Sequence, residues 1–226
     1  MTETQKLSMV FIHIPKCGGT SVRQALIEAG YDSGRMGHDT MKNALKYRSD
    51  IKEFIVQVRE PASRIVSAYN FMHRQLLDFP DRLPWLEKYT NMELNDWIRL
   101  LLLDEDAPNL EKRKPLKEYA AFSIHKLNSA APHEFAYHPR HSVRPQHSWV
   151  DHYMLPFKVF KIENGDIWNY FYKLGLNVYP LRLRASHATD KNPELKTVED
   201  LTEESKYIIY HKYIKDYKLF DYEPII

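Results

Sequence analysis

The feature that most constrains the fold is a stretch near the N-terminus where an apolar run, a glycine-containing turn and a helical segment follow one another. The run Met9–Ile14 predicts a buried strand, and Val22–Ala29 predicts a helix. The backbone N–H groups of such a turn, together with the helix N-terminus, form a site for an anion, most simply a phosphate. The turn consists of Lys16, Cys17, Gly18, Gly19, Thr20 and Ser21. It therefore supplies a lysine, a pair of glycines and two hydroxyl groups.

This stretch is not a Walker A loop, because Lys16 precedes the glycines and the pattern Gly-x-x-x-x-Gly-Lys-Ser/Thr is absent. The alternative is a surface turn that carries a solvated lysine, since glycine pairs are common in loops. The combination of a lysine, a glycine pair and Thr20-Ser21 between a strand and a helix favours the anion site.

A second stretch has a similar order. Phe54–Val58 predicts another buried strand, which ends at Arg59, and Pro61 suits the first turn of the helix that follows. Arg59 therefore stands at the carboxyl end of a strand, where open α/β sheets bind ligands, and Ser67 on the helix can share the same anion. The alternative is that Arg59 caps a helix or pairs with Glu60, and that Ser67 is merely solvated.

The order strand, helix, helix, strand, helix in the first part of the chain predicts a parallel sheet. We expect an α/β fold, a P-loop-like three-layer core with a central parallel sheet. We expect a single domain over 1–226, with a mostly helical insertion at about 72–155 that shapes the substrate site. Further elements are expected at 91–103 (helix), 116–128 (helix), 157–162 (strand), 165–174 (helix), 178–183 (strand) and 202–217 (helix).

Composition narrows the class of protein. A net charge of +2 over 226 residues gives no field that would favour nucleic acid, and 43% hydrophobic residues exclude a disordered chain. The single cysteine excludes an internal disulfide framework, which fits a cytoplasmic location. Residues 1–8 are polar, and neither a signal peptide nor a membrane span is expected from the sequence, so we expect a soluble protein.

The two stretches together resemble the cofactor-binding motifs of sulfotransferases that use 3′-phosphoadenosine 5′-phosphosulfate (PAPS). The motif His-Ile-Pro-Lys-x-Gly-Gly-Thr-Ser is most similar to that of the carbohydrate branch, which includes heparan-type 2-O- and 6-O-sulfotransferases. Similarity continues at 144–146, 159–163 and 216–222. One departure is Cys17, where the family commonly has Thr or another small residue. One explanation is that Cys17 is simply a small residue that fits at this position. The alternative is a redox role for its thiol.

The resemblance implies a PAPS-dependent sulfotransferase that transfers a sulfuryl group to an acceptor hydroxyl, on a carbohydrate. It places Lys16 at the phosphosulfate, with the rest of the loop from Cys17 to Ser21 around it. It also implies that Arg59 and Ser67 hold the 3′-phosphate of the donor. No metal is expected, because the second strand ends in Arg59 rather than in the aspartate that helps to hold Mg²⁺ in phosphoryl-transferring P-loop enzymes.

The reaction needs a base near neutral pH, and histidine is the obvious type. His38 is our choice, because a Gly-His pair between the two cofactor motifs looks like the position of the catalytic base in the carbohydrate branch. The alternative for His38 is a residue at a helix entry. A second group competes for the role: His133, His138, His141, His147 and His152. Its spacing does not match a His-Glu-x-x-His zinc motif, and an acceptor-facing loop is the favoured reading.

Two other functions stay open at this point. One is a kinase-like, nucleotide-dependent phosphotransferase of related fold, which would require Mg²⁺ and ATP. The other is a non-catalytic module that binds a nucleotide or a glycan. The sequence does not predict the identity of the acceptor, the hydroxyl position or the oligomeric state.

Overall fold

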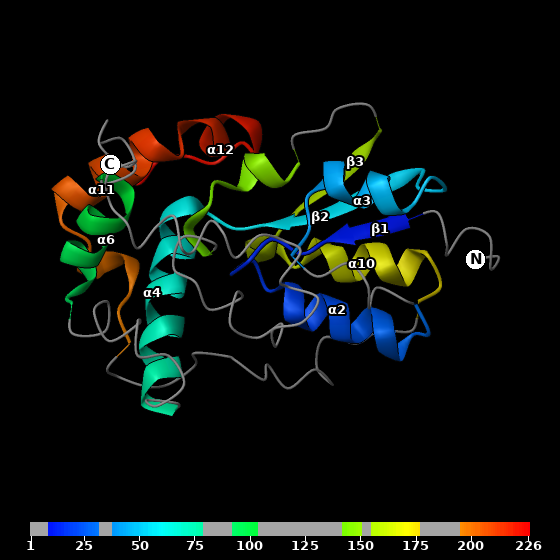
Figure 1. Ribbon diagram of the computed structural model, residues 1–226, viewed down its shortest axis with the longest axis horizontal. Coiled ribbons are helices and arrows are strands. Elements are labelled where there is room, and N and C mark those ends of the chain that lie inside the picture. Colours follow the sequence, from blue (N-terminus) through cyan, green and yellow to red (C-terminus); the bar gives the residue numbers. More distant parts are fainter. Residues whose placement is uncertain (1–8, 32–37, 79–91, 104–141, 151–154, 177–194) are drawn as a thin grey trace. The chain divides into compact units, whose positions relative to one another are not determined.

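The computed structural model describes residues 9–31, 38–78, 92–103, 142–150, 155–176 and 195–226 (Figure 1). The chain divides into two compact units. The first comprises Met1–Glu60, Pro145–Lys191 and Lys215–Glu223, and the second comprises Pro61–Arg144, Asn192–Ile214 and Pro224–Ile226. The prediction of one domain with an insertion at 72–155 is not tested by this division. The predicted elements at 116–128 and 178–183 lie outside the described residues.

The first unit is built on a parallel sheet. Its described strands, in the order β1-β2-β3, are β1 (Met9–Ile12), β2 (Glu53–Val58) and β3 (Phe157–Lys161). Both neighbouring pairs are parallel, with Ile12 opposite Val56 and Val58 opposite Lys161. The carboxyl ends of the three described strands therefore lie at one edge of the sheet, and the predicted parallel sheet is confirmed.

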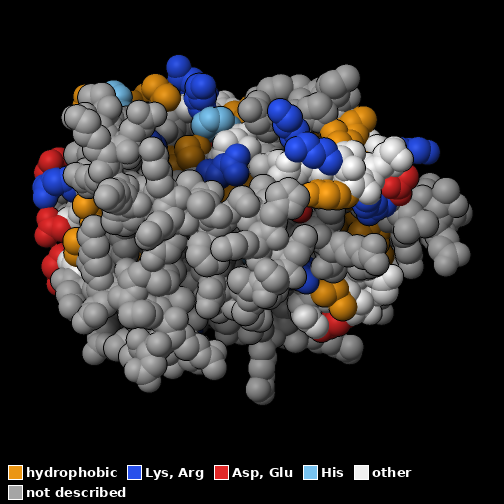
Figure 2. All heavy atoms as spheres, in the orientation of Figure 1, with side chains coloured by type: hydrophobic (Ala, Val, Ile, Leu, Met, Phe, Trp, Pro, Cys, Tyr) orange, Lys and Arg blue, Asp and Glu red, His pale blue; other side chains and the backbone are white. Residues whose placement is uncertain are grey.

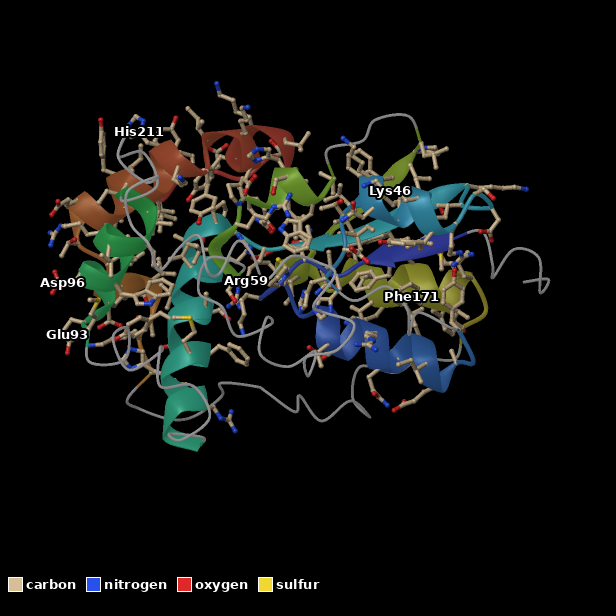
Figure 3. The ribbon with its side chains drawn as sticks, in the orientation of Figure 1. Lys46, Arg59, Glu93, Asp96, Phe171 and His211 are labelled. Atoms are coloured by element: carbon tan, nitrogen blue, oxygen red, sulfur yellow. The ribbon has the colours of Figure 1, made fainter. Side chains whose placement is uncertain are left out.

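Helices cover both faces of this sheet (Figure 1). Successive side chains of a strand point to opposite faces. Phe54 and Val56 pack in one cluster with α3 (Met41–Tyr47), whereas Ile55 packs in another with α2 (Gly19–Glu28) and α10 (Asp166–Lys173). Phe171 of α10, labelled in Figure 3, is fully buried in the second cluster. The three-layer α/β core is confirmed.

The ends of these helices follow from their sequences. Thr40 precedes α3 and its side chain accepts a hydrogen bond from the backbone of Asn43, which satisfies a donor of the first turn. Gly165 and Gly175 flank α10 with φ of 68° and 73°, a left-handed conformation that glycine adopts at no steric cost. Local sequence signals thus account for the start of α3 and for both ends of α10.

Short helices complete the first unit. Two of them are one-turn 3₁₀ segments, η3 (Gln146–Trp149) and η4 (Ile162–Asn164), and the third, near the C-terminus, is α12 (Ile214–Leu219). Trp149 of η3 and Phe220, which follows α12, both pack in the cluster that contains α3. Two segments far along the chain from β1 and β2 thus contribute to the core beside these strands.

The second unit is helical in its described part. It contains α4 (Pro61–Asp78), α6 (Leu94–Leu103), the 3₁₀ segment η6 (Val198–Asp200) and α11 (Glu203–Lys212). The predicted helix over 202–217 is wrong as one element, since α11 ends at Lys212 and α12 begins at Ile214. Tyr213 interrupts it with φ −109° and ψ 21°, and its fully buried hydroxyl donates to the carbonyl of Val143.

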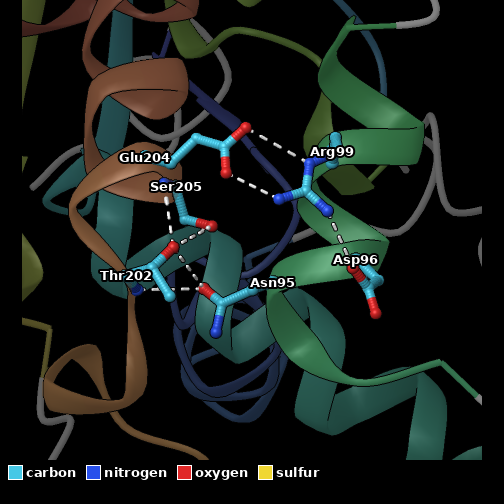
Figure 4. A network of polar contacts seen from close by, with 6 residues as sticks. All are labelled: Asn95, Asp96, Arg99, Thr202, Glu204 and Ser205. Atoms are coloured by element: carbon cyan, nitrogen blue, oxygen red, sulfur yellow. Dashed lines mark hydrogen bonds and ion pairs between the residues drawn. The ribbon is translucent and has the colours of Figure 1, made fainter.

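Exposed polar contacts join α6 to α11 (Figure 4). Arg99 pairs with Glu204 at 2.6 Å and with Asp96 at 2.9 Å, and all three side chains are exposed. Asn95 accepts a hydrogen bond from the backbone N–H of Thr202 at 3.0 Å. Figure 2 shows acidic and basic side chains next to one another at the left edge, over these two helices. Within the described ranges, no helix has the length and apolar character needed to cross a membrane.

Candidate functional site

The turn between β1 and α2 holds its backbone in an unusual conformation. Lys16 has φ 65° and Gly18 has φ 71°, both in the left-handed region, and α2 begins at Gly19. Positive φ is uncommon for a residue other than glycine, and such residues gather at functional sites. The turn thus brings the chain from the end of β1 directly to a helix N-terminus, the geometry that binds anions.

Both glycines are required by their neighbours. A Cβ atom on Gly18 would lie 2.6 Å from Cδ1 of Ile162 and 2.9 Å from Nε2 of Gln57. A Cβ atom on Gly19 would lie 2.0 Å from Cδ2 of His13. The two glycines therefore let the turn pack closely against Gln57 of β2 and against His13 and Ile162, which follow β1 and β3, and a loosely attached surface turn would not need this.

The side chains of the turn differ in their access to a ligand. Thr20 is exposed, and Lys16 and Ser21 are half-buried, so a cation and two hydroxyls reach the surface at the start of α2. Cys17 is fully buried, and its Sγ donates to Oε1 of Gln146 at 3.1 Å. Burial makes this thiol inert, which weighs against a redox role. If Cys17 contacts an anion, it does so through its main-chain atoms rather than through its side chain.

His38 lies beside the end of β1. Its Nδ1 is 3.1 Å from the carbonyl oxygen of His13, and the centroids of the two imidazole rings are 4.3 Å apart. A carbonyl oxygen can only accept, so Nδ1 of His38 carries the hydrogen in this contact. The lone pair of the neutral ring is then on Nε2, the atom that can take a proton from another group.

Burial lowers the pKa of His38 below 6.5, because it disfavours the charged imidazolium. The contact with the His13 carbonyl opposes this shift, while the positive charges of Arg23 and Lys16 add to it. His38 is therefore neutral at pH 7, the form that a general base requires.

Arg59 follows β2 at the carboxyl edge of the sheet, with its side chain half-buried (Figure 3). Its backbone is held from both sides by the amide of Gln146, which accepts from the N–H at 2.9 Å and donates to the C=O at 2.7 Å. The next residue, Glu60, accepts from the hydroxyl of Tyr217 at 2.9 Å. The structure thus places Arg59 at a strand end that is fixed by hydrogen bonds.

The remaining residues of the second sequence stretch belong to the second unit. Ser67 is half-buried on α4, and its pairing with Arg59 on one anion stays a prediction. Arg64 is fully buried, and its guanidinium donates to the carbonyl oxygens of Ser142 and Arg144, each at 2.8 Å. Arg64 therefore holds a neighbouring segment of its own unit.

Gln146 and Asp216 were not predicted as functional residues. Both are fully buried, and the backbone N–H of Gln146 donates to Oδ2 of Asp216 at 2.7 Å. The only signal was that each lies in a segment that resembles the family. His147, one of the alternative bases, has its Nδ1 2.7 Å from Oδ1 of Asp216. The other four histidines of that group lie outside the described residues: His133, His138, His141 and His152.

Metal ligands do not gather in the described part of the chain, where no group of three or more His, Cys, Asp or Glu side chains is placed to hold an ion. The site brought together in the first unit is thus a cationic turn at a helix N-terminus, a neutral histidine and an arginine at a strand end. These groups can bind an anion and accept a proton.

Comparison with known proteins adds one finding. A family model described as the sulfotransferase family matches residues 1–125 of the 226. No curated protein and no solved structure gave a match. The matched range includes Lys16, His38, Arg59 and Ser67, and it ends before Gln146 and the C-terminal segment.

Proposed function

The chain belongs to the sulfotransferase family, and from this premise we propose that it transfers the sulfuryl group of PAPS to a hydroxyl of a carbohydrate. The observation that carries the proposal is the turn with Lys16 and Gly18 in left-handed conformations at the start of α2. In this proposal the turn binds the 5′-phosphosulfate end of the donor.

Lys16 is the group that meets the phosphosulfate. Its ammonium is a compact positive charge, and the helix N-terminus beside it adds N–H groups that point at an anion. The hydroxyls of Thr20 and Ser21 add further donors. Charge stabilisation of this kind acts where negative charge develops during transfer, and it is often the largest single contribution to catalysis.

Arg59 and Ser67 hold the 3′-phosphate in this proposal. A guanidinium offers several N–H donors in a planar fork that matches the oxygens of a phosphate. The 3′-phosphate is the group that distinguishes this donor from ATP, so the two residues set the specificity for the donor. No metal ion is part of the proposal.

His38 is the proposed base. It takes the proton of the acceptor hydroxyl at Nε2, since Nδ1 is engaged with the His13 carbonyl. The acceptor oxygen forms a bond to sulfur, and the bond between sulfur and the bridging phosphate oxygen breaks. The leaving 3′-phosphoadenosine 5′-phosphate takes the bonding pair, and Lys16 stabilises its new charge.

We assign the acceptor to the carbohydrates because His13-Ile14-Pro15-Lys16 and the residues after it resemble the heparan-type 2-O and 6-O branch. A single cysteine, which allows no internal disulfide, supports a cytoplasmic location.

Thermal unfolding with 3′-phosphoadenosine 5′-phosphate tests the donor site. A ligand at about 100 times its Kd stabilises the folded protein by about 2.7 kcal/mol, so the melting temperature should rise clearly. ATP with Mg²⁺ serves as the comparison. A rise in melting temperature with ATP and Mg²⁺ but not with 3′-phosphoadenosine 5′-phosphate would favour a phosphotransferase. No rise with the bisphosphate at saturating concentration would contradict the donor assignment.

Labelled PAPS incubated with a panel of glycans, read by mass spectrometry, tests the reaction and the acceptor. Lys16→Ala should lose turnover while the fold is kept, with Lys46→Ala on the exposed face of α3 as the matched control (Figure 3). Equal turnover in both variants would contradict the role of Lys16. Donor binding without a sulfated product on any acceptor would favour a binding module.

A further inference from the structure

Gln146 joins two segments that are far apart in the sequence. It is the first residue of η3, it is fully buried, and its side-chain amide contacts Arg59 after β2 and Cys17 after β1. Its sequence separations from these residues are 87 and 129. One side chain thus touches both segments to which anion binding is assigned.

The contacts to Arg59 determine which way the amide faces. The backbone N–H of Arg59 can only donate, so the atom of Gln146 at 2.9 Å from it is the carbonyl oxygen. The carbonyl of Arg59 can only accept, so the atom at 2.7 Å from it is the amide nitrogen. Gln146 therefore pairs with Arg59 as a neighbouring strand would, at the point where β2 ends.

The same oxygen of Gln146 also accepts from Sγ of Cys17 at 3.1 Å. On its other side, the carbonyl of Cys17 accepts from Nε2 of Gln57, a residue of β2, at 2.8 Å. The middle of the turn is thus held through its side chain by Gln146 and through its main chain by Gln57. Both glutamines are buried, where an unmade hydrogen bond is costly.

Asp216 fixes Gln146 in turn. Its fully buried carboxylate accepts from the backbone N–H of Gln146 at 2.7 Å and from that of His147 at 2.8 Å. Nδ1 of His147 also lies 2.7 Å from the carboxylate. A buried carboxylate is stable only with such partners, so η3 is anchored to α12 through its first two residues.

We propose that Gln146 is the positioning residue of the donor site, which holds the turn with Lys16 and the strand end with Arg59 at a fixed distance from one another. This role rests on the proposed function, since it concerns a donor with anionic groups at both ends. A ligand of that kind binds well only if both cations are held in place before it arrives. Gln146 does not touch the donor.

The reactivity of Cys17 provides a direct test. It is the only cysteine of the chain, so a thiol reagent applied to the native protein reports opening of the turn alone. Gln146→Leu keeps the size of the side chain and removes its hydrogen bonds. We expect labelling of Cys17 to become roughly tenfold faster, the factor that corresponds to the loss of one net hydrogen bond.

Ile167→Ala is the matched control. Ile167 is buried in α10, in the cluster on the opposite face of the sheet from Cys17. This variant lowers stability without touching the turn, so urea unfolding of both variants separates local from global opening. Labelling in Gln146→Leu that is no faster than in the control, at equal stability, overturns the proposal. If Gln146→Leu does not fold, Gln146→Met replaces it, because its flexible side chain of similar length also removes both hydrogen bonds to Arg59.

Protection by 3′-phosphoadenosine 5′-phosphate completes the experiment. In the wild type it should slow the labelling of Cys17. In Gln146→Leu, the ligand concentration that gives half of the full protection should rise roughly tenfold. A merely structural change, as in Ile167→Ala, leaves this midpoint unchanged. An unchanged midpoint in Gln146→Leu overturns the positioning role. Absence of protection in the wild type, with faster labelling in Gln146→Leu, instead contradicts the proposed donor.

Discussion

The segments around Gln146 in the first unit and the surface of α6 and α11 in the second unit use polar side chains in opposite ways. In the first unit, Gln146 and Asp216 are fully buried and hold main-chain groups of two separate segments, one at Arg59 and one at Gln146-His147. In the second unit, Arg99 pairs with Asp96 and Glu204 on an exposed surface. Buried polar contacts are costly to break, because the partner left behind loses its hydrogen bond away from water, whereas exposed ion pairs contribute little. The comparison indicates that buried polar side chains, including Arg64 of the second unit, hold main-chain groups in place, whereas the exposed ion pairs of α6 and α11 contribute little to this.

The largest effect is expected from His38→Ala. Loss of a general base lowers kcat by about 10²- to 10⁴-fold. Binding of 3′-phosphoadenosine 5′-phosphate, measured by calorimetry, should survive. The control is His211→Ala in the second unit, where the ring of an exposed histidine lies 4.1 Å from that of Tyr207. Wild-type turnover in His38→Ala would direct attention to His147.

Asp216→Ala should show the second-largest effect, on stability. The substitution leaves the backbone N–H groups of Gln146 and His147 without their acceptor in a buried place. We expect the free energy of unfolding to fall by about 3 kcal/mol, read from urea denaturation. A loss as small as that of an exposed ion pair would contradict the contrast between buried and exposed polar contacts.

Gly18→Ala tests how closely the turn is packed. Gly18 and Gly30 have nearly the same φ, 71° and 73°, but only at Gly18 would a Cβ atom meet other atoms within 4 Å. We expect a loss of about 1 kcal/mol in Gly30→Ala from the backbone alone, and about 2–3 kcal/mol in Gly18→Ala from backbone and overlap. Equal losses in chemical denaturation would show that Ile162 and Gln57 move aside easily.

The pH dependence of turnover should reflect His38. Because its pKa lies below 6.5, the base stays neutral and turnover stays constant down to a pH under 6.5. Below the pKa, kcat should fall about tenfold per pH unit. Stability changes in the same direction: from pH 6.5 down to the folded-state pKa, the unfolded chain takes up the proton first, and the free energy of unfolding decreases. A decline of kcat that begins well above pH 6.5 would point to another base.

The smallest effect is expected from Arg99→Ala in the second unit. Its ion pairs with Asp96 and Glu204 are exposed and screened by salt. The midpoint of urea unfolding should stay within experimental error, and added salt should remove any remaining difference. A clear shift would mean that the contacts of Figure 4 stabilise the unit more than their exposure suggests.

Local patterns predicted much of the fold. The apolar runs predicted β1 and β2, and Pro61 predicted the start of α4, which the structure confirms. Each of these signals acts over a few residues. The break at Tyr213 was missed, because the hydroxyl contact with Val143 that accompanies it lies 70 residues away in the sequence.

The site was predictable only in part, for the same reason. The turn, His38 and Arg59 lie in recognisable motifs, and the structure places them in one unit. Gln146 and Asp216 carry no signal beyond their place in segments that resemble the family, since their roles arise from contacts across 69 to 129 residues. Arg64 lies between Arg59 and Ser67 in the sequence, yet burial and two carbonyl partners assign it a structural role.

The left-handed backbone of Lys16 determines which substitution at this position would stabilise the protein. At φ 65° a lysine has a conformational free energy about 1 kcal/mol less favourable than that of a glycine. Lys16→Gly is therefore the simplest stabilising replacement. A chain optimised for stability alone would therefore discard the cation on which the proposed chemistry depends. Thermostable variants chosen without an activity screen are expected to lose function first at this position.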